Sequence, residues 1–216
     1  MKKIEACIFD LDGVIVDTAK YHYRAWKKLA NELGFEFTEE QNEKLKGVSR
    51  MDSLDILLKF GNVNVSYEEK CLLAEKKNNW YVEFISNIKD EDILPGAKEF
   101  LQIVINNNIK TALGSVSKNA MTILTKLGLE NYFNSIIDGN KVVNAKPNPE
   151  VFLLGAKELN VLPENCVVFE DAEAGIQAAV NAGMYSIGIG DRGILSGANF
   201  VINSLEEMEI DKFQLL

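Results

Sequence analysis

The sequence predicts an α/β fold: a doubly wound, Rossmann-like parallel sheet with a small helical domain inserted after its first strand. Three patterns support this fold class. A short apolar run lies at residues 4–9, no convincing strand follows between Val16 and Asp92, and helix-like and strand-like segments alternate from Pro95 onward. At 216 residues the chain can form one substantial core domain and a small insertion.

The opening run ends abruptly in two carboxylates. Residues 4–9 are mostly apolar and β-favouring, which is typical of a central parallel strand that is covered on both faces. Gly13 then permits a backbone reversal that a side chain would resist. Asp10 and Asp12 are therefore expected at the carboxyl end of the first strand, where ligands bind in open α/β sheets.

Helical patterns fill the next part of the chain. Residues 19–33 place apolar side chains at three-and-four spacing, and Gly34 follows as a stop signal. Further helices are expected at 39–46, 52–60 and 66–86. An all-helical stretch at this position predicts a separate small domain.

The chain is accordingly divided into a core domain over residues 1–18 and 88–216 and a helical cap domain over residues 19–87. Two linkers would join them, with Thr18 as a hinge residue in the first.

The core elements resume after the insertion as alternating helices and strands. The expected ranges are helix 95–107, strand 109–114, helix 118–128, strand 134–138, helix 148–159, strand 165–169, helix 173–182 and strand 185–189. Gly128 and Gly183 are expected to end two of these helices. A final apolar run, Asn199–Ile202, predicts an edge strand before a short terminal helix.

Composition excludes several classes of protein. With 47% hydrophobic and 25% charged residues the chain is typical of a soluble globular protein, and a net charge of -9 argues against a general nucleic-acid surface. No apolar segment approaches the roughly 20 residues that span a bilayer, and the Met-Lys-Lys start leads into a strand rather than a signal peptide. Three cysteines, Cys7, Cys71 and Cys166, without a Cys-x-x-Cys pair, favour a reducing cytoplasm.

The paired carboxylates suggest phosphoryl transfer. A carboxylate such as Asp10 can attack phosphorus and form an acyl phosphate, while Asp12 moves the proton of the attacking or leaving oxygen. Because phosphate and carboxylate repel each other, a cation must lie between them, and Mg²⁺ prefers such oxygen ligands. The alternative for an isolated Asp-x-Asp pair is a solvated turn rich in Asp.

Three further groups follow later predicted strands. Ser115 precedes a helix, where its hydroxyl and free backbone N–H groups could hold a phosphate, although such a serine can also be a simple helix cap. Lys146 lies in a loop restricted by two prolines and could offset charge on phosphoryl oxygens, unless it is merely exposed. Glu170 and Asp171 could complete a carboxylate cluster around Mg²⁺ or merely complement a helix dipole.

The chain resembles the haloacid dehalogenase superfamily of aspartyl phosphoryl-transfer enzymes. The resemblance lies in the order and position of Asp10-x-Asp12, Ser115, Lys146 and Glu170-Asp171. The resemblance covers both the core and the inserted helical cap. It implies that Asp10 is the nucleophile and Asp12 the general acid/base. It also implies one Mg²⁺ per chain, held by Asp10, the backbone carbonyl of Asp12 and Asp171, with Glu170 as a further ligand or as a partner of the ligands.

The insertion carries a second basic signal. Lys46-Gly47-Val48-Ser49-Arg50 forms a basic loop between two predicted helices, with Ser53 one turn further on. Arg50 can bind a phosphate with two parallel hydrogen bonds, whereas a lysine cannot. A phosphatase needs one phosphate site, but a phosphomutase must hold a bisphosphate at both ends, so this loop favours a mutase. The alternative for Lys46 and Arg50 is a solvated helix end.

The chain resembles the sugar phosphomutases of that superfamily at further positions. The resemblance implies that the cap loop, Ser117 and Asn119 bind the non-transferring phosphate, and that His22 lies beside the acid/base with Lys77 as its neighbour. The other substrate-binding candidates are Trp26, Val116 and Lys118. His22 could instead have a core or capping role, and Trp26 is better explained as cap core.

Two positions depart from the mutase pattern. Val116 stands where that pattern has a smaller residue, which would narrow the sugar pocket. Ala172 follows Asp171 where a hydroxyl residue is usual, which removes one polar contact near the metal.

The expected activity is the interconversion of β-D-glucose 1-phosphate and glucose 6-phosphate, with glucose 1,6-bisphosphate as activator and intermediate. The expected protein is a cytoplasmic monomer without nucleic-acid or membrane partners. One alternative is a Mg²⁺-dependent sugar-phosphate phosphatase. Another is a non-catalytic switch in which Asp10 accepts a phosphoryl group as a signal, but this gives no role to Asp12 or to the insertion.

Overall fold

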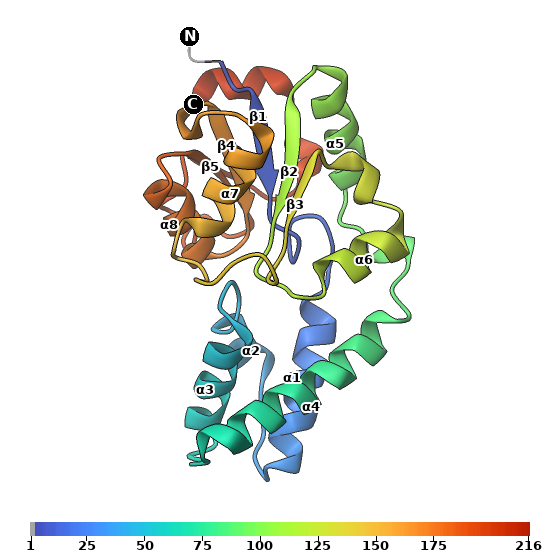
Figure 1. The fold of residues 1–216 in the computed structure, drawn as a ribbon, viewed down its shortest axis with the longest axis vertical. Helices are drawn as coiled ribbons and strands as arrows, with labels where there is room; N and C mark the ends of the chain where they lie inside the picture. The colour runs from blue at the N-terminus through green and yellow to red at the C-terminus, as the bar shows by residue number, and fades with distance from the viewer. Residues whose placement is uncertain (1–2) are drawn as a thin grey trace. The chain divides into compact units, whose positions relative to one another are not determined.

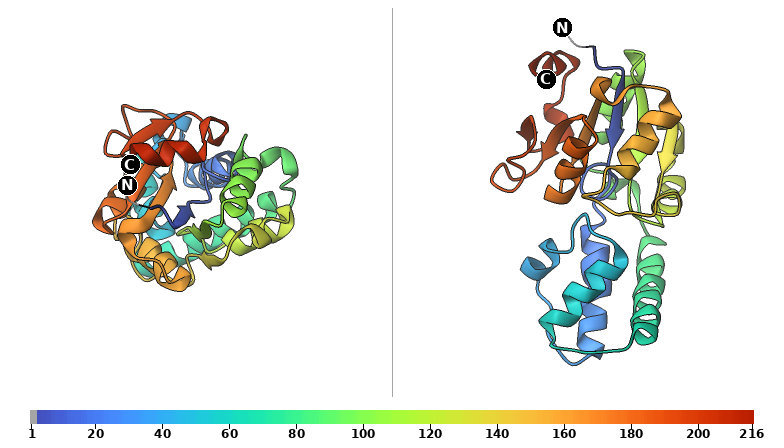
Figure 2. Two further views of the ribbon diagram at one scale, coloured as in Figure 1. Left: turned by 90° about the horizontal axis from the view of Figure 1, so that it is seen from above. Right: turned by 60° about the vertical axis from the view of Figure 1, so that its left-hand side comes forward.

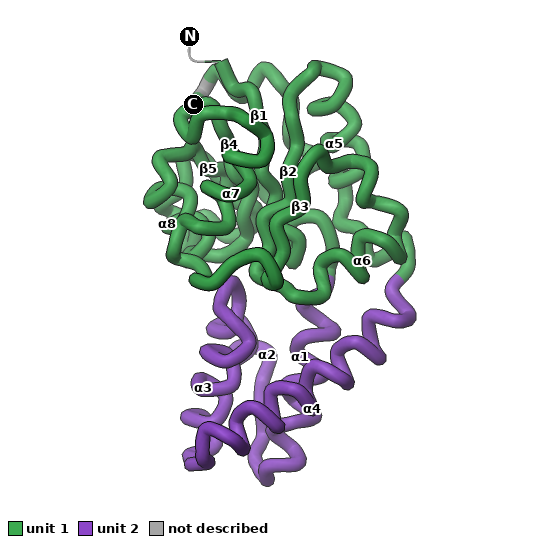
Figure 3. The backbone as a smooth tube through the Cα atoms, in the orientation of Figure 1, with its two compact units in different colours: residues 1–17, 89–216 green, residues 18–88 purple. Residues whose placement is uncertain are grey.

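The computed structural model describes residues 3–216 and divides the chain into two compact units. The first unit runs over residues 1–17 and 89–216, and the second over residues 18–88 (Figure 3). The second unit is thus one continuous stretch, whereas the first is assembled from two separated stretches.

A six-stranded parallel sheet forms the centre of the first unit, in the order β3-β2-β1-β4-β5-β6 (Figure 1). β1 lies between β2 and β4, with Ile8 opposite Ala112 and Val168. Figure 2 shows β1 as the blue arrow between elements from the C-terminal half of the chain. The strands are β1 (Ala6–Phe9), β2 (Lys110–Gly114), β3 (Ser135–Ile137), β4 (Cys166–Glu170), β5 (Tyr185–Ile189) and β6 (Phe200–Ile202). The predicted doubly wound fold is confirmed.

Helices cover both faces of this sheet. α7 (Glu150–Leu159) and α8 (Glu173–Asn181) share one apolar cluster with β1, β2 and β4, which includes Ile8. α5 (Ala97–Asn106) packs on the other face, where Phe100 meets Phe9 at a ring distance of 6.1 Å. α6 (Ala120–Leu127) follows β2.

The alternation of side chains along β1 explains why it is buried throughout. Ala6 and Ile8 point into the cluster under α7 and α8, so Cys7 and Phe9 point to the opposite face. Phe9 stacks on Phe169 of β4 with ring centroids 4.6 Å apart. Asp10 follows directly and therefore leaves a strand that is fixed on both faces.

The second unit is a helical bundle. Its helices are α1 (Ala19–Glu32), α2 (Glu39–Glu43), α3 (Arg50–Phe60) and α4 (Tyr67–Ile85), and residues 18–88, all of them described, contain no strand. The buried side chains that form its core are Trp26, Leu29, Ala30, Phe37, Leu45, Leu54, Leu57, Leu58 and Ala74.

Several helix ends differ from the predicted ones for local reasons. α5 begins at Ala97 because Gly96 adopts a left-handed conformation with φ +78°. α3 begins at Arg50, two residues earlier than predicted, because the Ser49 hydroxyl accepts the N–H of Asp52. The short terminal helix consists of two 3-10 segments, at Leu205–Glu207 and Ile210–Leu215.

No helix within residues 3–216 is both long and apolar enough to cross a membrane. Met1 and Lys2, which form most of the Met-Lys-Lys start, lie outside the described residues.

Candidate active site

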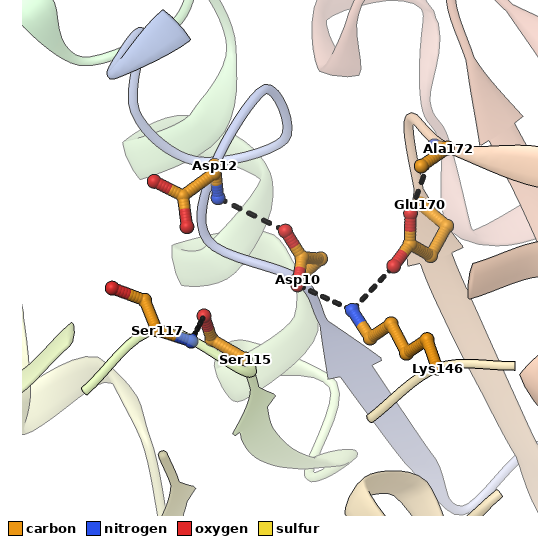
Figure 4. A network of polar contacts seen from close by, with 7 residues as sticks. All are labelled: Asp10, Asp12, Ser115, Ser117, Lys146, Glu170 and Ala172. Atoms are coloured by element: carbon orange, nitrogen blue, oxygen red, sulfur yellow. Dashed lines mark hydrogen bonds and ion pairs between the residues drawn. The ribbon is translucent and has the colours of Figure 1, made fainter. Parts of the chain in front are cut away.

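Asp10 lies at the carboxyl end of β1, in the middle of the sheet. Its backbone N–H donates to the carbonyl of Phe169, and the residue is only 6% exposed. The Oδ1 atom accepts a hydrogen bond from Lys146 Nζ at 2.5 Å, and Oδ2 accepts one from the backbone N–H of Asp12 at 3.0 Å. Both carboxylate oxygens are therefore held in place (Figure 4).

Lys146 joins two carboxylates beneath the site. It is 4% exposed, follows β3 in the loop over residues 138–149, and pairs with both Asp10 and Glu170. Burial alone would lower the pKa of Lys146, but the negative charges of Asp10 and Glu170 raise it above its usual value. The ammonium is therefore charged, and it compensates the carboxylate on which chemistry is expected. The Lys146–Pro147 peptide bond is cis.

Glu170 and Asp171 end β4 but have different surroundings. Glu170 pairs with Lys146, and its Oε2 accepts the N–H of Ala172 at 2.9 Å. Burial raises the pKa of Glu170, and Lys146 opposes this rise. Asp171 lies beside the first loop, because a Cβ added at Gly13 would be 2.1 Å from Asp171 Oδ2. Gly13, with φ +84°, thus leaves space for this carboxylate.

Ser115 and Ser117 form the turn between β2 and α6. The Ser115 hydroxyl accepts the N–H of Ser117 at 3.1 Å, and the Ser117 hydroxyl accepts the N–H of Asn119 at 3.3 Å. α6 therefore begins at Ala120 rather than at 118 as predicted. Since Phe9 is opposite Leu113, Ser115 lies at the same edge of the sheet as Asp10.

The donor set fits Mg²⁺. The Asp10 carboxylate, the Asp12 carbonyl and the Asp171 carboxylate are all oxygen donors, and the absent side chain of Gly13 allows Asp171 to approach the first loop. Within residues 3–216, no three His, Cys, Asp or Glu side chains form a group that could hold a metal ion. Glu170 is already paired with Lys146, which favours its role as a partner of the ligands over direct ligation.

The basic loop of the second unit connects α2 to α3. Lys46 pairs with Glu43 at 2.8 Å, and the Ser49 hydroxyl caps α3 and donates to Asp52 at 2.6 Å. Arg50 begins α3, and burial lowers the pKa of its guanidinium. Gly47 has φ +72° at the turn, beside Val48, and Ser53 is buried.

The predicted neighbourhood of His22 and Lys77 is present within the second unit. Lys77 Nζ lies 2.9 Å from His22 Nδ1, and since an ammonium can only donate, Nδ1 is the acceptor. Burial, followed by the positive charges of Lys77 and Arg50, lowers the pKa of His22 well below its usual value. Trp26 is 2% exposed in the cap core, so the core explanation fits it better than a sugar platform.

The contacts thus bring together Asp10, Asp12, Lys146 and Glu170 at the centre of the sheet edge. Val116 and Lys118 lie in the turn formed by Ser115 and Ser117, and Thr18 precedes α1. Sequence reasoning missed the residues that support this edge, Asn140 and Glu150. The signal that could have found them is the density of Asn, Asp and Gly between β3 and α7, because such side chains bond to nearby backbone.

Comparison with known proteins identifies the family of this chain. The family model described as haloacid dehalogenase-like hydrolase matches residues 4–183. A β-phosphoglucomutase of Bacillus subtilis is 41% identical over 210 residues, which cover 96% of this chain and 93% of that protein. A phosphorylated carbohydrates phosphatase of Thermotoga maritima is 36% identical, over 85% of this chain and 84% of the relative.

A solved structure is similar to this chain in both fold and sequence. The crystal structure of β-phosphoglucomutase from Clostridium difficile superimposes with a TM-score of 0.92 and 51% sequence identity, and the match covers 98% of this chain and 96% of the other. The family model and these relatives extend over both the sheet and the helical insertion. The chain therefore belongs to the family of haloacid dehalogenase-like hydrolases.

Proposed function

We propose that the protein is a phosphomutase that interconverts β-D-glucose 1-phosphate and glucose 6-phosphate through an aspartyl phosphate on Asp10. The observation that carries this choice is similarity to β-phosphoglucomutases over nearly the whole chain, at 41% and 51% identity. The phosphatase relative is 36% identical over a smaller share, so phosphate release is the second candidate.

The core residues can perform both halves of such a reaction. Phosphorylated Asp10 transfers its phosphoryl group to the 6-hydroxyl of the sugar, and Asp12 accepts the proton of that hydroxyl. The resulting glucose 1,6-bisphosphate turns around. Asp10 then attacks the phosphorus at the 1-position, Asp12 returns the proton to the anomeric oxygen, and glucose 6-phosphate leaves with Asp10 phosphorylated again.

Lys146 and Ser115 support these transfers. The buried ammonium of Lys146 stabilises negative charge that builds up on the phosphoryl oxygens, and the Ser115 hydroxyl is available at the same sheet edge. We assign one Mg²⁺ to Asp10, the Asp12 carbonyl and Asp171, where the ion would screen the repulsion between carboxylate and phosphate.

The second phosphate is assigned to residues outside the catalytic centre. We assign it to Lys46, Ser49 and Arg50 of the cap loop together with Ser117 and Asn119, and we assign Thr18 as the hinge. His22 with Lys77 is proposed to link the cap to the acid/base Asp12. In this assignment residues 1–18 and 88–216 form the catalytic domain, and residues 19–87 the cap.

A coupled assay tests the proposal. Purified protein is given β-glucose 1-phosphate and Mg²⁺, and glucose 6-phosphate is measured with and without catalytic glucose 1,6-bisphosphate. A mutase is expected to show isomerisation that the bisphosphate accelerates. Release of inorganic phosphate without isomerisation would instead support the phosphatase.

A further inference from the structure

The loop over residues 138–149 lies against two parts of the active site. It leaves β3 beside the Ser115–Asn119 turn and reaches α7 just after Lys146. Its backbone thus connects the turn assigned to the non-transferring phosphate with the ammonium that pairs with Asp10. Two side chains, Asn140 and Glu150, hold the two ends of this connection.

At the first end, Asn140 and Gly139 bond directly to the Ser115–Asn119 turn. The Asn140 side-chain amide donates to the carbonyl of Lys118 at 3.2 Å, and the N–H of Gly139 donates to the carbonyl of Ser117 at 3.1 Å. A Cβ at Gly139 would be 2.2 Å from the carbonyl oxygen of Val116. The turn therefore rests on the backbone of the loop, without space for a side chain between them.

The amide of Asn140 is itself held in one orientation. Its Nδ2 donates to Asp138 Oδ2 at 2.9 Å, and its backbone N–H donates to Asp138 Oδ1 at 3.0 Å. An aspartate at position 140 would lose the donor to Lys118 and face the carboxylate of Asp138.

At the other end, Glu150 gathers the chain just before Lys146. Its Oε1 accepts the N–H of Val143 at 3.0 Å, and its Oε2 accepts the N–H and the side-chain amide of Asn144 at 2.8 and 2.9 Å. These bonds, first that from Val143, lower the pKa of Glu150. The ionised carboxylate therefore ties Val143 and Asn144 to the start of α7.

We propose that Asn140 and Glu150 are positioning residues that fix, through one loop, the phosphate-binding turn and the ammonium of Lys146 relative to each other. The proposal rests on the proposed function, in which Ser117 and Asn119 bind the non-transferring phosphate. Asn140 then governs the affinity for the sugar phosphate. Glu150 governs the transfer step, because it holds Val143 and Asn144 in the segment that leads to Lys146.

Steady-state kinetics of two reactions separate these roles: sugar-phosphate isomerisation, and hydrolysis of acetyl phosphate, which has no second phosphate. Asn140→Ala and Asn140→Asp are expected to raise KM for β-glucose 1-phosphate about three- to tenfold with little change in kcat. Glu150→Gln is expected to lower kcat of both reactions about three- to tenfold, with KM near that of the wild type.

Matched controls lie next to both residues. Lys141 follows Asn140 but its side chain pairs with Glu158, and Lys157 is exposed on α7. Lys141→Gln and Lys157→Gln should retain wild-type kinetics. Thermal unfolding of every variant shows whether it is folded, and if Asn140→Ala is not, the nearly isosteric Asn140→Asp decides.

The outcomes distinguish this inference from the proposed function. If the wild type isomerises the sugar phosphate but the Asn140 and Glu150 variants match the lysine controls, the positioning roles are wrong. Losses of kcat that only match the unfolded fraction of each variant, with KM unchanged, would also overturn them, because unfolded protein lowers the apparent kcat but not KM. If the wild type does not isomerise at all, the proposed function fails, while acetyl phosphate hydrolysis by Glu150→Gln still tests the link to Lys146.

Discussion

The two oxygens of Asp10 have different partners, and this difference shapes its chemistry. Oδ1 pairs with Lys146, while Oδ2 accepts the backbone N–H of Asp12. A buried carboxylate keeps its charge only when such partners replace water. These two partners fix the orientation of the Asp10 carboxylate before any substrate arrives, as a nucleophile requires.

Replacing Asp10 by Asn keeps the shape of the side chain but removes the nucleophilic charge. We expect Asp10→Asn to lower turnover by at least about 10³-fold, because no covalent intermediate can form. Mass spectrometry after incubation with acetyl phosphate should find a phosphoryl adduct on the wild type and none on the variant. Asp211→Asn, an exposed position, serves as the control. Turnover retained by Asp10→Asn would remove the basis of the mechanism.

Arg50 tests the second phosphate site. Arg50→Lys retains a positive charge but loses the two-pronged hydrogen bonding of the guanidinium, so mutase activity is expected to fall about tenfold. Hydrolysis of acetyl phosphate should be unchanged. Lys59→Gln, at an exposed position further along α3, is the matched control. An equal loss of both activities would contradict a role at the distal phosphate.

His22 predicts a pH dependence of stability. Its pKa is lower in the folded chain than its ordinary value, so below that value the unfolded chain binds a proton that the folded chain does not. The free energy of unfolding should therefore decrease as the pH falls from about 7.5 to about 5. Urea denaturation of wild type and His22→Gln should show a steeper decrease in the wild type; parallel curves would contradict the assigned shift.

Some residue roles could be predicted from sequence and others could not. Asp10 and Asp12 stand out because an apolar strand ends at them. The different surroundings of Glu170 and Asp171 could not be predicted, because the two carboxylates are adjacent in sequence. Only the path of the 138–149 loop brings Lys146 to Glu170.

At the scale of elements, the loops decide where the helices begin. The order of strands and helices follows from hydrophobic periodicity, and the predicted ranges of the core elements differ from the observed ones by at most two residues. The larger error is at α2, which the sequence predicts to reach residue 46 but which ends at Glu43. The residues after it form turns that lead to Gly47, with φ +72°.

Gly13 couples the first loop to Asp171. Gly13→Ala must adopt φ +84° and also displace the Asp171 carboxylate, so we expect destabilisation of about 1–3 kcal/mol and weaker activation by Mg²⁺. Gly183→Ala is the matched control, because it has φ +70° but no atom within 4 Å of the added Cβ. The two variants are compared by thermal unfolding and by the Mg²⁺ dependence of their activity. An identical Mg²⁺ dependence would exclude the coupling of Gly13 to Asp171.

At the scale of the molecule, the two units differ in charge and in continuity. Residues 18–88 contain equal numbers of acidic and basic residues, so the net charge of -9 belongs to the sheet-containing unit. The apolar core of the second unit is formed entirely by its own residues. These properties indicate that it can fold without the first unit.

We therefore expect a chain of residues 18–88 to fold alone. Its circular dichroism should be helical and its thermal unfolding cooperative, although at this size the stability will be low. Leu57→Ala, at a fully buried core position, should abolish the transition, whereas Lys59→Gln should not. A non-cooperative melt of the unaltered fragment would show that its stability depends on the sheet-containing unit.

The place of β1 in the sheet has a consequence for biosynthesis. This strand is made first, yet its neighbours β2 and β4 are encoded more than a hundred residues downstream. At about 5–20 residues per second, the ribosome completes β4 roughly 10–30 s after β1. Throughout that interval at least one edge of this apolar strand stays unpaired, while the nascent polypeptide carries an insertion that can already be folded. Translation speed and chaperone supply should therefore govern the yield of active protein.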